Sequence, residues 1–185
     1  IAPVINKDVG IKNLSMTELQ KIFTGKITNW KQVGGPDEKI VIINRAQGSG
    51  IRKTFEQTVL PHGGAVNAQE QDANGTVQKV VQATPGAISY LSFSYFNKQL
   101  QPIAIDGVQP TAENVQTNRW KIWSYEHMYT QLKTNSATRD FLKYMTSQTV
   151  QKNLVSDLGY ISIHDMQVKR TMNGKVIPIR GEQND

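Results

Sequence analysis

The sequence predicts an α/β fold, in which short apolar strands alternate with amphipathic helices. Apolar runs at 39–44 and 87–91 are bounded by turn residues and have the length of buried strands. Apolar residues recur at helical spacing after Ser15, after Gly50 and between 135 and 158. At 185 residues, with 38% hydrophobic and 19% charged residues, the chain is long enough for one large domain or two small lobes.

A capping box predicts the first helix. Ser15 is a good N-cap residue, and Glu18 follows it at the spacing of the reciprocal side-chain caps. Apolar residues up to Phe23 supply the buried face, and Gly25 ends the helix.

The first strand, at 39–44, contains four consecutive aliphatic residues. Such a run is typical of a strand that is covered on both faces, as in a parallel sheet. The loop 45–50 follows it, and a helix is predicted from Ile51 to about Leu60.

The rest of the chain continues this alternation. The remaining elements expected are a helix opened by Asn74-Gly75, strands at 87–91 and 103–105, an aromatic-rich extended segment at 119–130, and a helical stretch at 135–158 that breaks near Ser147.

Composition excludes several classes of function. The net charge is +6, but no run of five cations exists, so a solvated surface is a simpler interpretation than a nucleic-acid site. For Trp30, Trp120 and Trp123 we expect packing in the core or at a hinge rather than base stacking. The chain has no cysteine, and its three histidines lack metal-ligand spacing. We therefore expect no metal centre and no cofactor.

The segment 39–53 carries the clearest chemical signal, because a buried strand, a Gly-Ser-Gly loop and a helix follow one another. A helix that starts at a strand end directs unpaired N–H groups and its positive dipole end at an anion. Gly48 and Gly50 permit close approach, Ser49 offers a hydroxyl, and Arg45 offers a planar fork. The spacing fits neither a P-loop nor a nucleophile elbow.

Two cations occupy the first turn of this helix, where the helix dipole disfavours them. A bound anion would remove that penalty for Arg52 and Lys53. Alternatively, both side chains reach into water and Arg52 pairs with Glu56 one turn later. The sequence leaves both interpretations open.

Several segments together resemble the PstS family, the phosphate-binding proteins of bacterial ABC phosphate importers, in its Gram-positive branch. The segments that carry the resemblance are 22–30, 44–50, Thr54-Phe55, 85–90 and 123–130. The resemblance implies a periplasmic-binding-protein-like fold of type II, with two α/β lobes that close on one oxyanion. Residues 6–118 would form the complete second, ligand-loop lobe. Residues 1–5 and 119–185 would form crossover strands and the C-terminal part of the first lobe.

The resemblance also implies the site residues. Arg45, Ser49, Gly50 and Ile51 match the family's phosphate-contacting loop, and Gly48 lies within it. Isoleucine replaces the family's usual threonine at position 51. The loss of a hydroxyl donor is expected either to weaken binding about tenfold or more or to change the ligand preference.

Asn74 and Gly75 begin a further helix that faces the same cleft in the family. They are candidates for closing over the anion. An ordinary N-cap within 72–75 is the simpler interpretation of this segment.

The implied function is non-catalytic capture of inorganic phosphate for the membrane permease of an ABC importer. The protein would be extracellular, with a lipid anchor. The chain begins where the family carries further βα units, so we expect an N-terminally truncated form whose incomplete first lobe offers a route to a homo-oligomer. Sulfate and arsenate remain alternative ligands. A ligand-sensing effector domain of a transcriptional regulator and an enzyme with Ser49 as nucleophile are the alternative functions.

Overall fold

The computed structural model describes residues 1–179, which form two compact units. The first comprises Ile1–Thr111 together with Trp120–Trp123, and the second comprises Ala112–Arg119 together with the chain from Ser124 onward. Strands and helices alternate along the first unit, so the predicted α/β class is confirmed. Within residues 1–179, no helix combines the length and the apolar character needed to cross a membrane.

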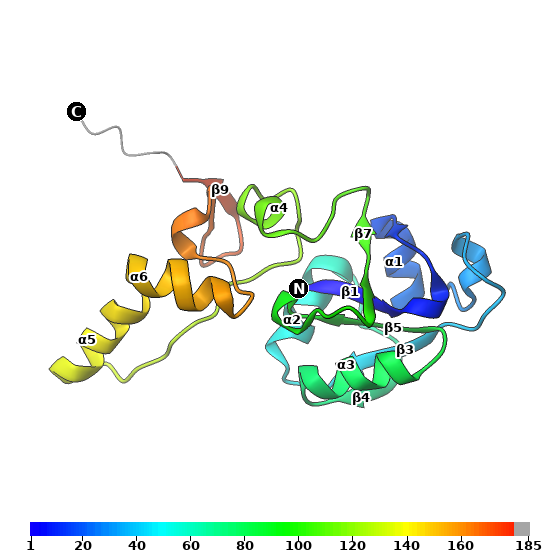
Figure 1. Ribbon diagram of the computed structural model, residues 1–185, viewed down its shortest axis with the longest axis horizontal. Helices are drawn as coiled ribbons and strands as arrows, with labels where there is room; N and C mark the ends of the chain where they lie inside the picture. Colours follow the sequence, from blue (N-terminus) through cyan, green and yellow to red (C-terminus); the bar gives the residue numbers. More distant parts are fainter. Residues whose placement is uncertain (180–185) are drawn as a thin grey trace. The chain divides into compact units, whose positions relative to one another are not determined.

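A five-stranded mixed sheet forms the centre of the first unit (Figure 1). In spatial order its strands are β4 (Gln69–Gln71), β3 (Val41–Arg45), β5 (Ala87–Leu91), β1 (Ala2–Asn6) and β6 (Leu100–Pro102). Strand β3 is parallel to β4 and β5, whereas β1 is antiparallel to β5 and β6. A short parallel pair, β2 (Asn13–Leu14) and β7 (Ala104–Ile105), accompanies the sheet.

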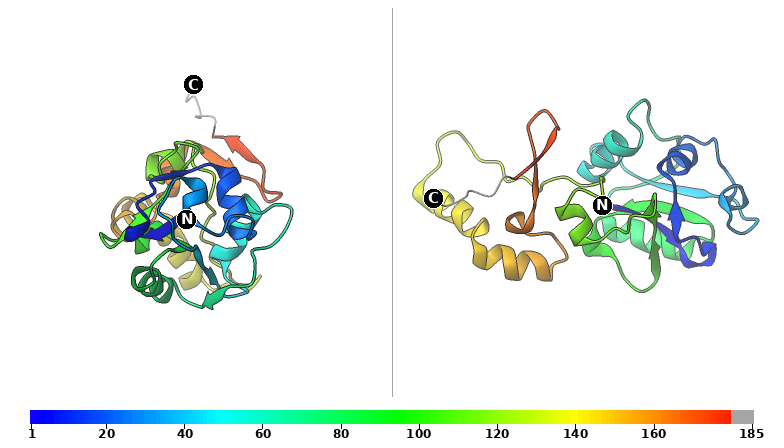
Figure 2. Two further views of the ribbon diagram at one scale, coloured as in Figure 1. Left: turned by 90° about the vertical axis from the view of Figure 1, so that its right-hand side faces the viewer. Right: turned by 90° about the horizontal axis from the view of Figure 1, so that it is seen from above.

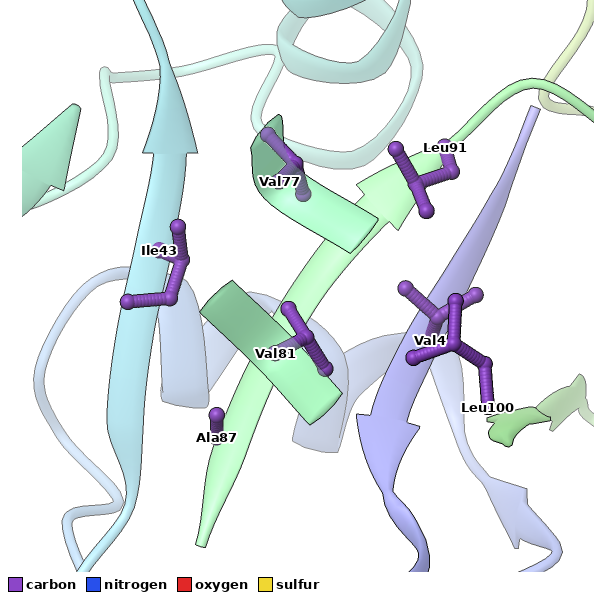
Figure 3. Packing of buried hydrophobic residues seen from close by; sticks show 7 residues of the cluster. All are labelled: Val4, Ile43, Val77, Val81, Ala87, Leu91 and Leu100. Carbon is purple, nitrogen blue, oxygen red and sulfur yellow. The ribbon is translucent and has the colours of Figure 1, made fainter. Parts of the chain in front are cut away.

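Helices cover both faces of this sheet. Helix α3 (Asn74–Ala83) lies on the opposite side from α1 (Met16–Phe23) in Figure 1. Figure 3 shows Val77 and Val81 of α3 above the strands, where they pack with Val4, Ile43, Ala87, Leu91 and Leu100.

The opposite face is aromatic. On β5, Tyr90 points away from the α3 side, since side chains alternate along a strand. Its ring stacks on Phe55 of α2 (Gly50–Val59) at a centroid distance of 4.0 Å, and Phe23 of α1 meets Phe55 edge-on at 4.8 Å. These three rings join α1 and α2 to the sheet, and each is fully buried.

The predicted capping box of the first helix and the predicted packing of the tryptophans in the interior are confirmed. The Ser15 hydroxyl accepts from the Glu18 amide at 3.1 Å, and the Glu18 carboxylate accepts from the Ser15 amide at 2.7 Å. The three tryptophans are at most 5% exposed. The indole N–H of Trp30 donates to the Gly86 carbonyl at 2.9 Å, which fixes the start of β5.

The second unit contains the C-terminal helices (Figure 2). Its helices are α4 (Ala112–Gln116), α5 (Ser136–Met145), α6 (Gln148–Val150) and a π-helical turn at Gln151–Val155. The predicted break near Ser147 is confirmed, because this residue caps α6. Strands β8 (Val168–Arg170) and β9 (Val176–Pro178) form an antiparallel hairpin. Residues 121–130 form neither a helix nor a strand.

Short 3₁₀ helices complete the two units. They are η1 (Lys7–Val9), η2 (Trp30–Val33), η3 (Phe93–Tyr95) and η5 (Ile163–Asp165).

Candidate anion-binding site

Two neighbouring parallel strands, β3 and β4, have their carboxyl ends at the same end of the sheet, called here the edge, and a helix starts after each. Arg45, the last residue of β3, pairs with Gln71, the last residue of β4. Helix α2 begins after the first strand and α3 after the second. The predicted site residues all lie on the two segments that leave this edge: Arg45, Gly48, Ser49, Gly50, Ile51, Asn74 and Gly75.

Arg45 connects the two segments. Its side chain is buried, and three of its N–H groups donate to the chain that leads from β4 into α3. Nε donates to the Gln71 carbonyl at 3.3 Å, and Nη2 donates to the Asp72 carbonyl at 2.7 Å. Nη1 donates to Oδ1 of Asn74 at 2.6 Å. These bonds hold the guanidinium at the start of α3.

The charge of Arg45 has no carboxylate partner. All three acceptors are neutral, and within residues 1–179 no acidic group forms an ion pair with this side chain. Because a guanidinium has five N–H groups, one remains on each terminal nitrogen. A buried cation costs free energy unless an anion is near it. The arrangement therefore favours an oxyanion that accepts two hydrogen bonds from Arg45.

The loop between β3 and α2 combines a flexible glycine, a capping serine and the start of a helix. Gly48 adopts a left-handed conformation with φ of +85°, which glycine adopts without strain. Ser49 caps α2, and its hydroxyl accepts from the Arg52 amide at 3.4 Å. The first amides of the helix, those of Gly50 and Ile51, have no acceptor within it. A Cβ added at Gly48 or Gly50 would meet no atom within 4 Å, so this backbone borders open space.

The start of α3 corrects one prediction. An ordinary N-cap was expected within 72–75, but the N-cap residue is Ala73 and no side chain caps the helix. Asn74 instead places its carbonyl oxygen on Arg45. Gly75 follows in the first turn, where an added Cβ would also meet open space. The Asn74 side chain thus acts on the arginine rather than on the helix end.

Arg52 and Lys53 differ, although they are neighbours in the same helical turn. Nε of Arg52 donates to Glu56 at 2.8 Å, so the predicted pairing one turn later is confirmed. Its Nη1 donates to Glu70 on β4 at 2.5 Å. Burial alone would lower the pKa of Arg52, but the hydrogen bonds to Glu70 and Glu56 outweigh it and raise that pKa. Lys53 is exposed.

Sequence reasoning missed several groups at this edge. The acceptors at Gln71 and Asp72 are backbone carbonyls, which every residue type has, so the residue types give no indication of them. Glu70 lies on a strand that was not predicted. Tyr90 was predicted only as part of a strand, yet its hydroxyl accepts from the Arg45 amide at 3.4 Å. Burial raises the pKa of Tyr90 to about 12, so the phenol is neutral at physiological pH.

Comparison with known proteins identifies the family. A family model described as a PBP superfamily domain matches residues 1–149, which is more than half of the chain. The chain belongs to the PBP superfamily. Phosphate-binding protein PstS of Bacillus subtilis (strain 168) is 44% identical to this chain over 176 residues. The match covers 95% of this chain and 59% of that protein. PstS of Borreliella burgdorferi is 31% identical, and the match covers 86% of this chain and 62% of that protein.

Solved structures agree with this placement in the PBP superfamily. A candidate phosphate ABC transporter substrate-binding protein with bound phosphate from Clostridium perfringens gives a TM-score of 0.81 at 32% identity, covering 88% of this chain and 68% of that one. An ABC-type phosphate transport receptor from Vibrio cholerae gives 0.70 at 26% identity, covering 86% and 68%. The predicted PBP-like fold and the resemblance to the PstS family are confirmed. The chain spans about three fifths of the length of the curated relatives, at 59% and 62%.

Proposed function

We propose that this chain is part of the substrate-binding component of an ABC-type phosphate importer, and that it captures inorganic phosphate without catalysis. Arg45 would donate two hydrogen bonds and supply the positive charge. Ser49 would offer its hydroxyl, and the amides of Gly50 and Ile51 would complete the cradle. Gly48 would let the backbone approach closely, Asn74 would hold the arginine through its side-chain oxygen, and Gly75 would leave space at the start of α3.

One observation carries the proposal. Arg45 is 7% exposed and is held by three neutral acceptors, with no acidic partner within residues 1–179. A purely structural arginine of this burial would be expected to pair with a carboxylate. Two starting helices add partial positive charge at the same edge of the sheet. The names of the PstS relatives support phosphate as the oxyanion.

The whole protein would work as a two-lobed clamp. Residues 6–118 would form the ligand-loop lobe, and residues 1–5 and 119–185 would form the crossovers and part of the other lobe. The first crossover would then be strand β1, which pairs with β5 and β6 in the sheet of the first unit. Closure would bury the phosphate, and the closed form would dock on the membrane permease. The protein would act outside the cell, held by a lipid anchor, and the partial lobe could join a second copy.

The experiment is a phosphate titration of the 185-residue chain followed by ¹H–¹⁵N NMR, which locates weak binding as well as strong binding. Sulfate and chloride at equal ionic strength serve as controls. We expect saturable shifts of the amides of Ser49, Gly50 and Ile51 with phosphate. In the variant Arg45→Lys, which keeps the charge but lacks the planar fork, the dissociation constant should rise about tenfold or more.

Two results would overturn the proposal. Shifts that chloride reproduces would show only a general salt effect on the loop. Saturable shifts that map outside the two segments, or that are equal in Arg45→Lys, would place the anion elsewhere.

A further inference from the structure

Arg52 contacts three elements around the loop that follows β3. It lies in the first turn of α2, and its side chain is 13% exposed. Besides Glu56 of its own helix and Glu70 of β4, its Nη1 donates to the backbone carbonyl of Arg45 at 2.8 Å. A single guanidinium thus joins the end of β3, the edge strand β4 and the start of α2.

The two arginines of this region have opposite electrostatic surroundings. The charge of Arg52 is matched by two carboxylates, and its bonds to them are 2.8 Å and 2.5 Å long. The charge of Arg45 is matched by none within residues 1–179. An anion at the helix start would therefore be attracted by Arg45, while Arg52 is already neutralised. The contacts of Arg52 call for a role other than attraction of the ligand.

The bond to the Arg45 carbonyl indicates that role. This carbonyl belongs to the peptide that links Arg45 to Ala46, where the strand ends and the loop starts. The Ala46 amide, in the same peptide, donates to the Gln71 carbonyl at 2.8 Å, and Ser49 closes the loop with a bond to the Ala46 carbonyl at 3.2 Å. Arg52 therefore holds the first peptide of the loop from one side, while β4 holds it from the other.

We propose that Arg52 is a positioning residue, which fixes the loop from Arg45 to Ser49 in the conformation that binds the oxyanion. The part of this inference that concerns affinity rests on the proposed function. The part that concerns loop order does not, because every contact of Arg52 described above is with an atom of the chain itself. Loss of Arg52 would leave the Arg45–Ala46 peptide held from the β4 side alone, and would leave Glu56 and Glu70 as two unneutralised charges near the loop.

A charge-matched pair of variants tests the proposal. Arg52→Gln and Lys53→Gln each remove one positive charge from the same helical turn, but only Arg52 makes the contacts described. In the ligand-free chain, Arg52→Gln should speed hydrogen exchange of the Ala46 and Ser49 amides about tenfold. It should also raise the phosphate dissociation constant about tenfold, whereas Lys53→Gln should change either quantity less than about twofold.

Further variants keep the test decisive. Glu70→Ala removes one acceptor of the Arg52 guanidinium. If Arg52→Gln fails to fold, Glu70→Ala should still speed exchange of the same two amides. Adding Glu56→Gln and Glu70→Gln to Arg52→Gln removes the unneutralised carboxylates. Affinity should stay low in that triple variant, because the Arg45 carbonyl still lacks the hydrogen bond from Arg52.

The outcomes separate this inference from the proposed function. If Arg52→Gln and Lys53→Gln weaken phosphate binding equally and leave exchange unchanged, Arg52 acts only through its charge and the inference is wrong. Full recovery of affinity in the triple variant would overturn it as well. If phosphate fails to bind the unmodified chain but Arg52→Gln still speeds loop exchange, the proposed function fails while the positioning role stands.

Discussion

Asn6 at the end of β1 anchors the far end of α3, and its removal should destabilise the first unit. Its Nδ2 donates to the carbonyls of Val81, Gln82 and Thr84 at 3.0, 3.1 and 2.9 Å. Its Oδ1 accepts from the Asp8 amide at 3.0 Å. Arg45 holds the start of the same helix through Asn74, so the two contacts together pin α3 at both ends.

The expected cost of Asn6→Ala follows from these contacts. An amide group has two hydrogens, so its three acceptors count as about two hydrogen bonds of roughly 0.5–1.5 kcal/mol each. Loss of the cap on the Asp8 amide adds about 0.5–2 kcal/mol. The sum is about 3 kcal/mol, since Asn6 is 6% exposed and water does not readily replace its bonds.

Urea unfolding followed by tryptophan fluorescence measures this cost, because all three tryptophans belong to the first unit. With a slope of about 2 kcal/mol per molar, the midpoint should fall by about 1.5 M. Asn67→Ala, at an exposed position, is the matched control. A midpoint for Asn6→Ala within about 0.3 M of this control would refute the reasoning.

The isosteric change Asn6→Asp gives the same contacts a pH dependence. A buried carboxyl that faces three carbonyl oxygens holds its proton more tightly in the folded state, so its pKa there lies above the unfolded value of about 3.9. Stability should therefore be greatest below pH ~4 and fall as pH rises through the folded pKa. Asn67→Asp should not lose stability over the same range.

Two further predictions concern the site. Burial raises the pKa of Tyr90 to about 12, so the contribution of the neutral phenol to stability should be complete below pH ~10 and be lost between pH ~10 and ~12. Tyr90→Phe should lack this loss when unfolding midpoints are measured across that range. An identical loss in both proteins would contradict the assignment. Ile51→Thr adds a hydroxyl at the second residue of α2, and should tighten phosphate binding about tenfold in the NMR titration. Ile51→Val, which adds no hydroxyl, is its control, and equal changes in the two variants would exclude a new hydrogen bond.

Strands with apolar runs could be predicted from the sequence, and strands without them could not. The apolar runs that contain Ile43 and Ile88 predicted β3 and β5, two of the three interior strands, because a strand covered on both faces needs apolar side chains on both. Strand β4 has the sequence Gln-Glu-Gln and carries no apolar signal. It forms at the sheet edge by pairing with β3. Strand β1 contains Pro3, a residue that usually indicates an edge strand, yet it lies between β5 and β6.

The sequence predicted those parts of the candidate site that lie close together along the chain. The Gly-Ser-Gly loop and the helix start are local features, so Ser49, Gly50 and Ile51 were placed correctly at the N-terminus of α2. The partners of Arg45 were not predictable, because two of them are backbone carbonyls about 26 residues away in the chain. The pairing of Arg52 with Glu56 follows from helical spacing, whereas its contact with Glu70 depends on the pairing of two strands.

Strand register decides which of the two arginines has the Glu70 carboxylate as its partner. In the parallel pairing of β3 with β4, Asn44 lies opposite Glu70, and Arg45 lies opposite Gln71. Successive side chains on a strand point to opposite faces, so a slip of one residue would exchange the surroundings of the β4 side chains. The observed register gives the Glu70 carboxylate to Arg52 and leaves Arg45 with neutral acceptors. The proposed binding of an oxyanion at this end of the sheet would thus depend on the three-residue strand β4 as much as on the glycine-rich loop.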